Sequence, residues 1–277
     1  MGELVIAAVP LGNINDASDH LKSAITKADV ILAEDSRRFM RLCKDLGIEY
    51  RATVISFFEG NEKERLDDLL LSLQESKNIL LLTDAGMPTI SDPGYRAIRL
   101  AIDGGFTLRV IPGPSAVTTA LALSGLPTDR FCFEGFVPKT EGARQNRFEE
   151  LALEERTLIF FEAPHRIADF IATARQVFGD ERRGALCREM TKQYEETIRG
   201  TLKELAEWSL SKEMLGEFTI VIAGFDPSHT QLSEEEIAEK VKSYERSGIT
   251  RKEAISMVAV ECKVAKRKVF DIMVEYK

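Results

Sequence analysis

The chain has 277 residues, which is enough for about two compact domains, or for one domain with an appendage. Hydrophobic residues make up 44% of the chain and charged residues 30%, and these proportions exclude the disordered, collagen-like and coiled-coil classes. The net charge of −8 argues against a generally basic nucleic-acid-binding protein, because affinity for phosphate backbones comes largely from lysine and arginine. Only local basic patches could bind RNA or DNA.

The chain shows no sign of membrane insertion or metal binding. Its longest apolar run, residues 4–11, is far shorter than the roughly 18 residues of a membrane helix, and Glu3 precedes it where a signal peptide would be basic. The four cysteines form no C-x-x-C pair, and the three histidines have no metal-ligand spacing. We therefore expect a cytoplasmic protein without membrane contact, disulfide framework or structural metal.

Short apolar runs rich in valine and isoleucine alternate with segments of helical period, a pattern typical of βα units on a mainly parallel sheet. We predict five strands, at residues 4–9, 30–33, 53–57, 79–83 and 108–111, and a helix at 61–75. Pro112, Gly113 and Pro114 then break the chain, so the first α/β domain is expected at residues 1–113.

A second series of the same kind predicts a second α/β domain at residues 114–226. Its expected strands are 156–161, 184–188, 195–200 and 218–223, and its expected helices are 141–153 and 164–178.

The last segment, residues 233–277, is expected to be a helical appendage. Ser233 with Glu236 and Thr250 with Glu253 fit capping boxes, and they predict helices at 233–247, 250–260 and 264–276. Residues 249–277 carry seven basic and four acidic side chains, a net charge of +3. The segment is either a small bundle of the helix-turn-helix kind that contacts nucleic acid, or a packing appendage whose basic residues are a solvated face.

Loops with polar residues, glycine and proline follow four of the predicted strands, at residues 10–13, 34–38, 84–88 and 112–116. Ligands of open α/β sheets bind at these strand ends. The Rossmann fingerprint and the phosphate loop are absent, which argues against nicotinamide and ATP chemistry. Gly12 and Gly86 would let a ligand approach the backbone closely, and Asp84 can accept hydrogen bonds. Ser115 could begin a helix whose N–H groups bind a ligand carboxylate.

Three further polar segments lie beside strands of the second series, as strand ends that face a cleft do: residues 160–166, 187–196 and 216–218. Residues 113–115 lack the second small residue of a serine-hydrolase elbow, because Val117 stands in its place. Glu162 and Arg166 are either an exposed pair at a helix start or part of a cleft. Arg188, Glu189 and Lys192 are either a surface ion-pair cluster or an acid–base or substrate site.

Nine short motifs together carry a family resemblance. They are PLGN (10–13), AEDSR (33–37), TDAGMP (83–88), SDPGY (91–95), PGPSA (112–116), SGLPTDRF (124–131), EGF (134–136), FFEAPHR (160–166) and REMTK (188–192). In this order, from residue 3 to about 224, the chain resembles the bacterial small-subunit ribosomal RNA ribose methyltransferases of the tetrapyrrole-methylase-like class. These enzymes 2′-O-methylate a cytidine of the decoding centre. The departures are mild: Ser36, Thr83 and Met87 replace the family's more usual threonine, serine and threonine.

The resemblance implies a fold of two α/β domains with S-adenosylmethionine folded into the cleft between them, and a homodimer. It implies 16S rRNA as the substrate, met within the small ribosomal subunit. The implied cofactor residues, with Gly12 added for its place in the first loop, are Pro10, Gly12, Asp84, Ala85, Gly86, Ser115, Ala116 and Phe161.

Methyl transfer to a ribose hydroxyl requires positioning of the two reacting atoms and removal of a proton. Candidate bases or orienting groups are Glu34, Asp35, Glu189 and Lys192, and the sequence does not assign the acceptor among them. Candidate RNA contacts are Arg37, Arg38 and Arg41, which fall on one predicted helix, together with Arg166 and Arg188.

Two other functions remain open at this point. A related methyltransferase could act on a tetrapyrrole or another small molecule, and basic surface around the cleft is the feature that discriminates; the cluster from Arg37 to Lys44 favours RNA. A ribosome-associated binding module that uses only the helical tail would leave the cleft loops unexplained.

Overall fold

Two five-stranded sheets form the framework of the computed structural model, which describes residues 2–227, 233–262 and 266–276. Both sheets lie in one compact unit, Met1–Gly224, and a second unit comprises Phe225–Lys277. The predicted class of two α/β domains is confirmed, although the division near residue 113 stays a prediction, because Met1–Gly224 forms one unit.

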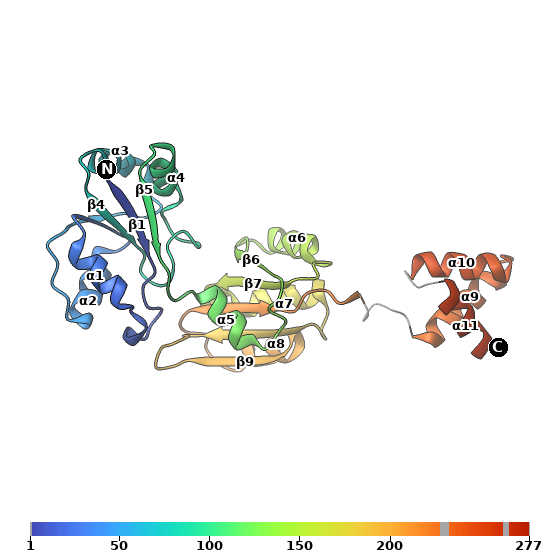
Figure 1. Cartoon of the computed structure of the whole chain (residues 1–277). Coiled ribbons are helices and arrows are strands. Elements are labelled where there is room, and N and C mark those ends of the chain that lie inside the picture. Colours follow the sequence, from blue (N-terminus) through green and yellow to red (C-terminus); the bar gives the residue numbers. More distant parts are fainter. Residues whose placement is uncertain (1, 228–232, 263–265, 277) are drawn as a thin grey trace. The chain divides into compact units, whose positions relative to one another are not determined.

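The first sheet is wholly parallel, with the strand order β3-β2-β4-β1-β5. Its strands are β1 (Glu3–Ala7), β2 (Val30–Ala33), β3 (Thr53–Ser56), β4 (Asn78–Leu82) and β5 (Thr107–Ile111). Helices α1 (Asp19–Lys27) and α2 (Ser36–Leu46) cover one face, and α3 (Glu62–Gln74) and α4 (Tyr95–Asp103) cover the other (Figure 1). Burial on both faces explains why β2 and residues 79–82 of β4 are uninterrupted apolar runs.

The second sheet has the order β6-β7-β10-β8-β9. Its strands are β6 (Phe131–Phe136), β7 (Thr157–Glu162), β8 (Arg183–Arg188), β9 (Glu196–Thr201) and β10 (Phe218–Ile222). The apolar side of α5 (Ala116–Ser124) packs on one face. On the other face lie α6 (Glu141–Leu151), α7 (Ile167–Phe178) and α8 (Leu202–Leu210).

Two expectations for the second sheet were wrong. Only β6 and β7 pair in parallel, and the remaining pairs are antiparallel, so the sheet is not mainly parallel. β6 itself was not predicted. Glu134 and Gly135 interrupt its apolar pattern, and the pairing register shifts between Phe133 and Gly135 as in a β-bulge.

Phe225–Lys277 contains the three predicted helices, α9 (Glu234–Arg246), α10 (Arg251–Glu261) and α11 (Lys266–Glu275), around an apolar core of their own. The capping box of Ser233 and Glu236 is confirmed. At Thr250 the hydroxyl caps the N–H of Glu253 but donates to the carboxylate of Glu253, so the reciprocal backbone bond of a capping box is not formed there. None of the helices in the described residues is long and apolar enough to cross a membrane.

Candidate active site

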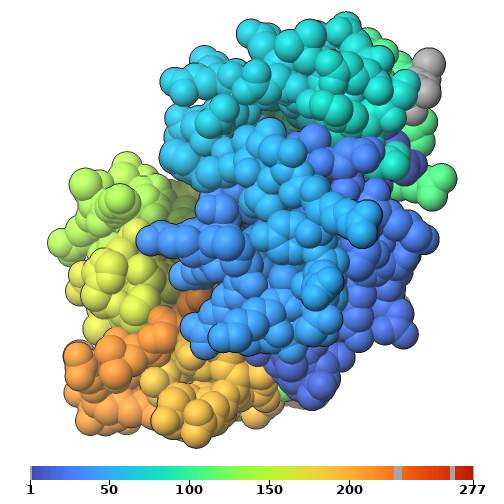
Figure 2. Space-filling view, turned by 90° about the vertical axis from the view of Figure 1, so that its left-hand side faces the viewer, coloured from blue at the N-terminus to red at the C-terminus, as the bar shows by residue number. Residues whose placement is uncertain are grey.

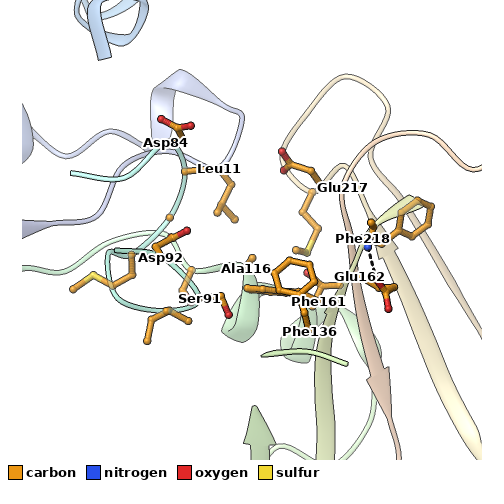
Figure 3. A pocket seen from close by; sticks show the side chains of 18 of the residues that line it. Leu11, Asp84, Ser91, Asp92, Ala116, Phe136, Phe161, Glu162, Glu217 and Phe218 are labelled. Carbon is orange, nitrogen blue, oxygen red and sulfur yellow. Dashed lines mark hydrogen bonds between the residues drawn. The ribbon is translucent and has the colours of Figure 1, made fainter. Parts of the chain in front are cut away.

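A cavity of about 420 Å³ lies in Met1–Gly224, where the loops of the first sheet meet strand ends of the second. The space-filling view shows these two parts side by side, the first in blue to teal and the second in green, yellow and orange (Figure 2). Apolar side chains that line the cavity are Leu11, Met87, Ile90, Ala116, Phe136, Phe161, Met190 and Phe218. Figure 3 shows Asp84 and Asp92 on one side and Glu162 and Glu217 on the other, with the rings of Phe136 and Phe161 between them.

Most of the residues predicted to hold the cofactor converge on this cavity. Those that line it are Asp84, Ala85, Gly86, Ser115, Ala116 and Phe161, whereas Pro10 and Gly12 are not among the lining residues. Ser115 precedes α5 as predicted but makes no capping bond through its side chain. The assignment of these residues to a cofactor stays a prediction.

Gly86 joins the loop after β4 to the loop after β1. Its backbone exchanges two hydrogen bonds with Val9, at 2.9 and 3.1 Å. Its φ of +74° is strained for any other residue, and a Cβ atom there would lie 3.2 Å from Cδ2 of Leu11, itself a lining residue. A side chain at position 86 would therefore displace part of the cavity wall.

Gly12 serves a different close approach from the one expected. A Cβ atom at this position would lie 2.3 Å from Cγ of Lys192, and the neighbouring Asn13 N–H donates to Oγ1 of Thr191 at 3.1 Å. Gly12 therefore allows the loop after β1 to pack against the loop after β8.

Three carboxylates gather at the end of β2 and β4. The Asp84 N–H donates to Oε2 of Glu34 at 3.1 Å, and Oδ1 of Asp84 accepts from the Asp35 N–H at 3.1 Å. Burial raises the pKa of both Glu34 and Asp84. Burial and repulsion from Glu34 and Asp84 raise the pKa of Asp92 to about 7. Within the described residues, the side chain of Asp92 has no hydrogen bond and no ion pair.

Asp35 and the neighbouring arginines form hydrogen bonds and ion pairs with nearby residues of the protein. Asp35 caps α2 by accepting from the Arg37 N–H at 2.8 Å, and its carboxylate also pairs with the Arg37 guanidinium. Hydrogen bonds from Arg37 hold the pKa of Asp35 far below its ordinary value, so it is a weak proton acceptor. Arg38 lines the cavity and lies 3.4 Å from Asp84, while Arg41 points to Asp45 at 3.7 Å on the exposed face of α2.

Glu189 and Lys192 form an ion-pair network beside the cavity rather than in it. Nζ of Lys192 donates to Oε1 of Glu189 and to Oε2 of Glu217, both at 2.9 Å, and only Glu217 lines the cavity. Burial opposes the charge on Lys192, but the bonds to Glu217 and Glu189 outweigh it and raise the pKa of the ammonium. Burial likewise opposes the ionised Glu189, and the bonds from the Glu217 N–H and Lys192 still lower its pKa. Arg188 donates to the carbonyl of Leu215 at 2.6 Å.

Glu162 and Arg166 are a buried pair, not the exposed pair considered from the sequence. The Glu162 side chain has no exposed area, and burial raises its pKa. Nη2 of Arg166 lies 3.2 Å from Oε2 of Glu162 without hydrogen-bond geometry, and donates instead to the carbonyls of Val137 and Pro138. The guanidinium of Arg166, a predicted RNA contact, is therefore engaged by groups of the protein itself.

Three acids of the cavity were not among the predicted site residues. Glu162 and the segment 216–218 with Glu217 were considered only as strand ends that face a cleft, and Asp92 was missed. Asp92 lies within a quoted family motif, but it stands far from the end of β4, in the long loop before α4. Glu217 stands directly before β10, at the opening end of an antiparallel strand. The rule that ligands bind at carboxyl ends of parallel strands points to neither position.

The cavity has the chemistry expected of a site for a cationic, partly flat ligand. Five carboxylates line it, from Glu34, Asp84, Asp92, Glu162 and Glu217, and Arg38 is the only lysine or arginine among its described lining residues. Most of the remaining lining side chains are apolar or aromatic. The first N–H groups of α5, near Ala116, are suited to a carboxylate. No group of three or more His, Cys, Asp or Glu side chains suited to a metal ion occurs in the part of the chain that the structure describes.

Comparison with known proteins identifies the class. The model of the family "Tetrapyrrole (Corrin/Porphyrin) Methylases" matches residues 3–206. The fold is shared with the solved structure of uroporphyrin-III C-methyltransferase from Thermus thermophilus in complex with S-adenyl homocysteine, at a TM-score of 0.55 and 18% identity, over 80% of this chain and 97% of that one. The chain belongs to the tetrapyrrole methylase family and is a methyltransferase, as the motifs predicted.

Curated relatives narrow the assignment within that class. The ribosomal RNA small subunit methyltransferase I of Mycobacterium tuberculosis is 45% identical over 258 residues, covering 93% of this chain and 89% of the relative. The protein of the same name from Bacillus subtilis is 36% identical over 278 residues, covering 98% and 94%. These identities confirm the resemblance to the rRNA methyltransferase branch of the family.

Proposed function

We propose that the protein transfers a methyl group from S-adenosylmethionine to the ribose 2′-hydroxyl of a cytidine in 16S rRNA. The observation that carries this proposal is the acidic, partly aromatic cavity, in a chain whose relatives are named ribosomal RNA small subunit methyltransferase I. When bound, the cofactor supplies an electrophilic methyl group on a positively charged sulfur.

The cavity residues have separate tasks in binding. Asp84, fixed by the Asp35 N–H, offsets positive charge at one wall, and Glu217 does so at the other. The N-terminal N–H groups of α5 hold a carboxylate, and the ring of Phe161 covers a flat group. The groups of the binding wall therefore come from both the first and the second sheet and their connecting segments.

We assign proton removal from the ribose hydroxyl to Asp92. Of the candidates from the sequence, Asp35 is held ionised by Arg37, Lys192 is held protonated, and Glu189 is paired with Lys192. Asp92 lines the cavity without a described partner, and a pKa of about 7 suits a general base near neutral pH. Glu34, the fourth candidate, is engaged by the Asp84 N–H and is the second choice.

RNA is proposed to approach along α2. The side chains of Arg37 and Arg41 are 85% and 84% exposed, and Arg38 between them reaches the cavity. The pairs of Arg37 with Asp35 and of Arg41 with Asp45 lie at the surface and contribute little to stability. Phosphates can therefore replace the two aspartates at low cost. We further propose that the substrate is the RNA within the small ribosomal subunit and that the enzyme acts as a homodimer.

Three measurements test this function. Calorimetric titration should show S-adenosylmethionine binding without added metal. Tritiated-methyl transfer onto small subunits from a strain lacking this gene should label one cytidine, at a linkage that alkali no longer cleaves. The double variant Arg37→Ala with Arg41→Ala should lose RNA affinity and keep cofactor affinity. Labelling of a tetrapyrrole in place of RNA would establish the small-molecule alternative and reject the proposal.

A further inference from the structure

A second hollow with the opposite character lies in Phe225–Lys277, between α10 and α11. This groove of about 530 Å³ is lined by Arg251, Lys252, Ile255, Lys266, Arg267 and Phe270. None of these described lining residues is acidic, whereas five carboxylates line the cavity of Met1–Gly224. In a chain of net charge −8, the groove is a local concentration of positive charge.

Some side chains of the groove hold the helices together, and the others form no ion pair with the described residues. Arg251 donates to the carbonyl of Met273 at 2.8 Å, and this bond joins α10 to α11. Ile255 belongs to the core of the three helices and forms an apolar floor. Lys252, Lys266 and Arg267 form no ion pair with any described residue, so their charges are available to an external anion.

Phe270 adds a flat apolar surface to this charged rim. Phe270 is 56% exposed, although Val269 and Ile272 on the same helix are buried in the core. An exposed aromatic ring among unpaired cations is the arrangement with which proteins bind single-stranded nucleic acid, where bases stack on the ring and phosphates contact lysine and arginine.

We propose that the groove between α10 and α11 binds a single-stranded segment of the substrate RNA, with Lys252, Lys266 and Arg267 on phosphates and Phe270 stacked on a base. The proposal rests on the proposed function for the choice of RNA as the partner. It separates the two tasks of the enzyme: the acidic cavity binds the methyl donor, and the basic groove adds affinity for a substrate that the net charge of the chain repels.

The test uses the full-length protein without cofactor and measures binding of a fluorescent single-stranded RNA by anisotropy at several salt concentrations. Lys252→Gln with Arg267→Gln should weaken binding at least about tenfold at low salt and reduce the salt slope by about 1.4, at roughly 0.7 per phosphate contact. Lys242→Gln with Arg246→Gln is the matched control, because it removes the same two residue types from α9, outside the groove. Phe270→Ala should weaken binding roughly fivefold or more without changing the slope.

Equal losses in the groove variant and the control would mean that only net charge matters, and would overturn the proposal. Unchanged binding in the groove variant, or binding to anionic lipid vesicles but not to RNA, would also overturn it. Circular dichroism verifies that each variant is folded. Cofactor titration and methyl transfer by the unaltered enzyme are measured separately, so a failure of the proposed function is visible even where the groove binds RNA.

Discussion

The acids Glu34, Asp84 and Asp92, in the loops after β2 and β4, and the acid Glu189, after β8, lie in the same unit but have opposite properties. Asp84 lies 3.4 Å from Arg38, Glu34 and Asp92 form no ion pair with a described residue, and burial raises the pKa of each of the three acids. Glu189 pairs with Lys192, and its pKa is lowered despite burial. Glu189, with its partner Lys192, holds loops together, whereas Glu34 and Asp92, which have no ion pair among the described residues, can serve a cationic ligand or accept a proton.

The largest effect is expected from removing the unpaired acid. Asp92→Asn should lower the single-turnover rate of methyl transfer about 10²- to 10⁴-fold at saturating cofactor and subunits, the usual contribution of a general base. The measurement is a rapid-quench assay of tritium incorporation. Glu196→Gln is the control, because Glu196 is an acid that already forms an ion pair, with Lys212 at 2.8 Å. Its rate should stay within about threefold of the unaltered rate. An Asp92→Asn enzyme that keeps a third of the rate would show that Glu34 or another group accepts the proton.

Blocking the cavity wall should have the next largest effect. Gly86→Val introduces a branched side chain at φ +74° against Leu11, and should weaken S-adenosylmethionine binding at least about tenfold by calorimetry. Gly47→Val imposes the same kind of strain at φ +66°, at the end of α2 with no atom within 4 Å of the added Cβ. If both variants bind the cofactor equally well, the cavity is not its site.

The comparison also explains what the sequence could predict. Strands such as β2 and β4 are short apolar runs because both faces of their sheet are covered, and the residue pattern records that burial directly. Helix starts at Ser233 and Thr250 were predictable because capping is local. β6 was not, because its half-exposed residues and its bulge give no regular alternation.

Site residues followed the same division. Those directly after a strand, such as Asp84 and Ser115, were found because strand ends converge by topology. Asp92 was not singled out, because only folding of the loop before α4 brings it to the cavity beside Glu34 and Asp84. The commitment of Asp35, Glu189 and Lys192 to caps and ion pairs likewise depends on partners that spacing alone does not reveal.

The raised pKa of Asp92 also predicts how stability changes with pH. In the folded protein Asp92 keeps its proton up to about pH 7, whereas the ordinary value is 3.8. Its contribution to the free energy of unfolding is therefore full below about pH 3.8 and is lost progressively as the pH rises from there through about 7. Asp92→Asn removes this titration, so without cofactor its Tm should exceed that of the unaltered protein by about 2 °C or more at pH 8, and by less at pH 5. Thermal melts at the two pH values measure this, and an equal difference at both would contradict the shift.

The smallest effect on rate is expected from changes in the ion pair of Glu189 and Lys192. Lys192→Met and Glu189→Gln should each retain more than about a third of the single-turnover rate, because the Lys192 ammonium is held protonated by Glu189 and Glu217 and cannot accept a proton. They should instead lower the Tm, since Lys192 packs on Gly12 and the Glu189 carboxylate accepts the Glu217 N–H at 2.9 Å. A loss of a hundredfold in rate with an unchanged Tm would return proton removal to these residues. Rate and stability separate the two cases because a base acts only in the transition state, whereas an ion pair between loops contributes before any substrate binds.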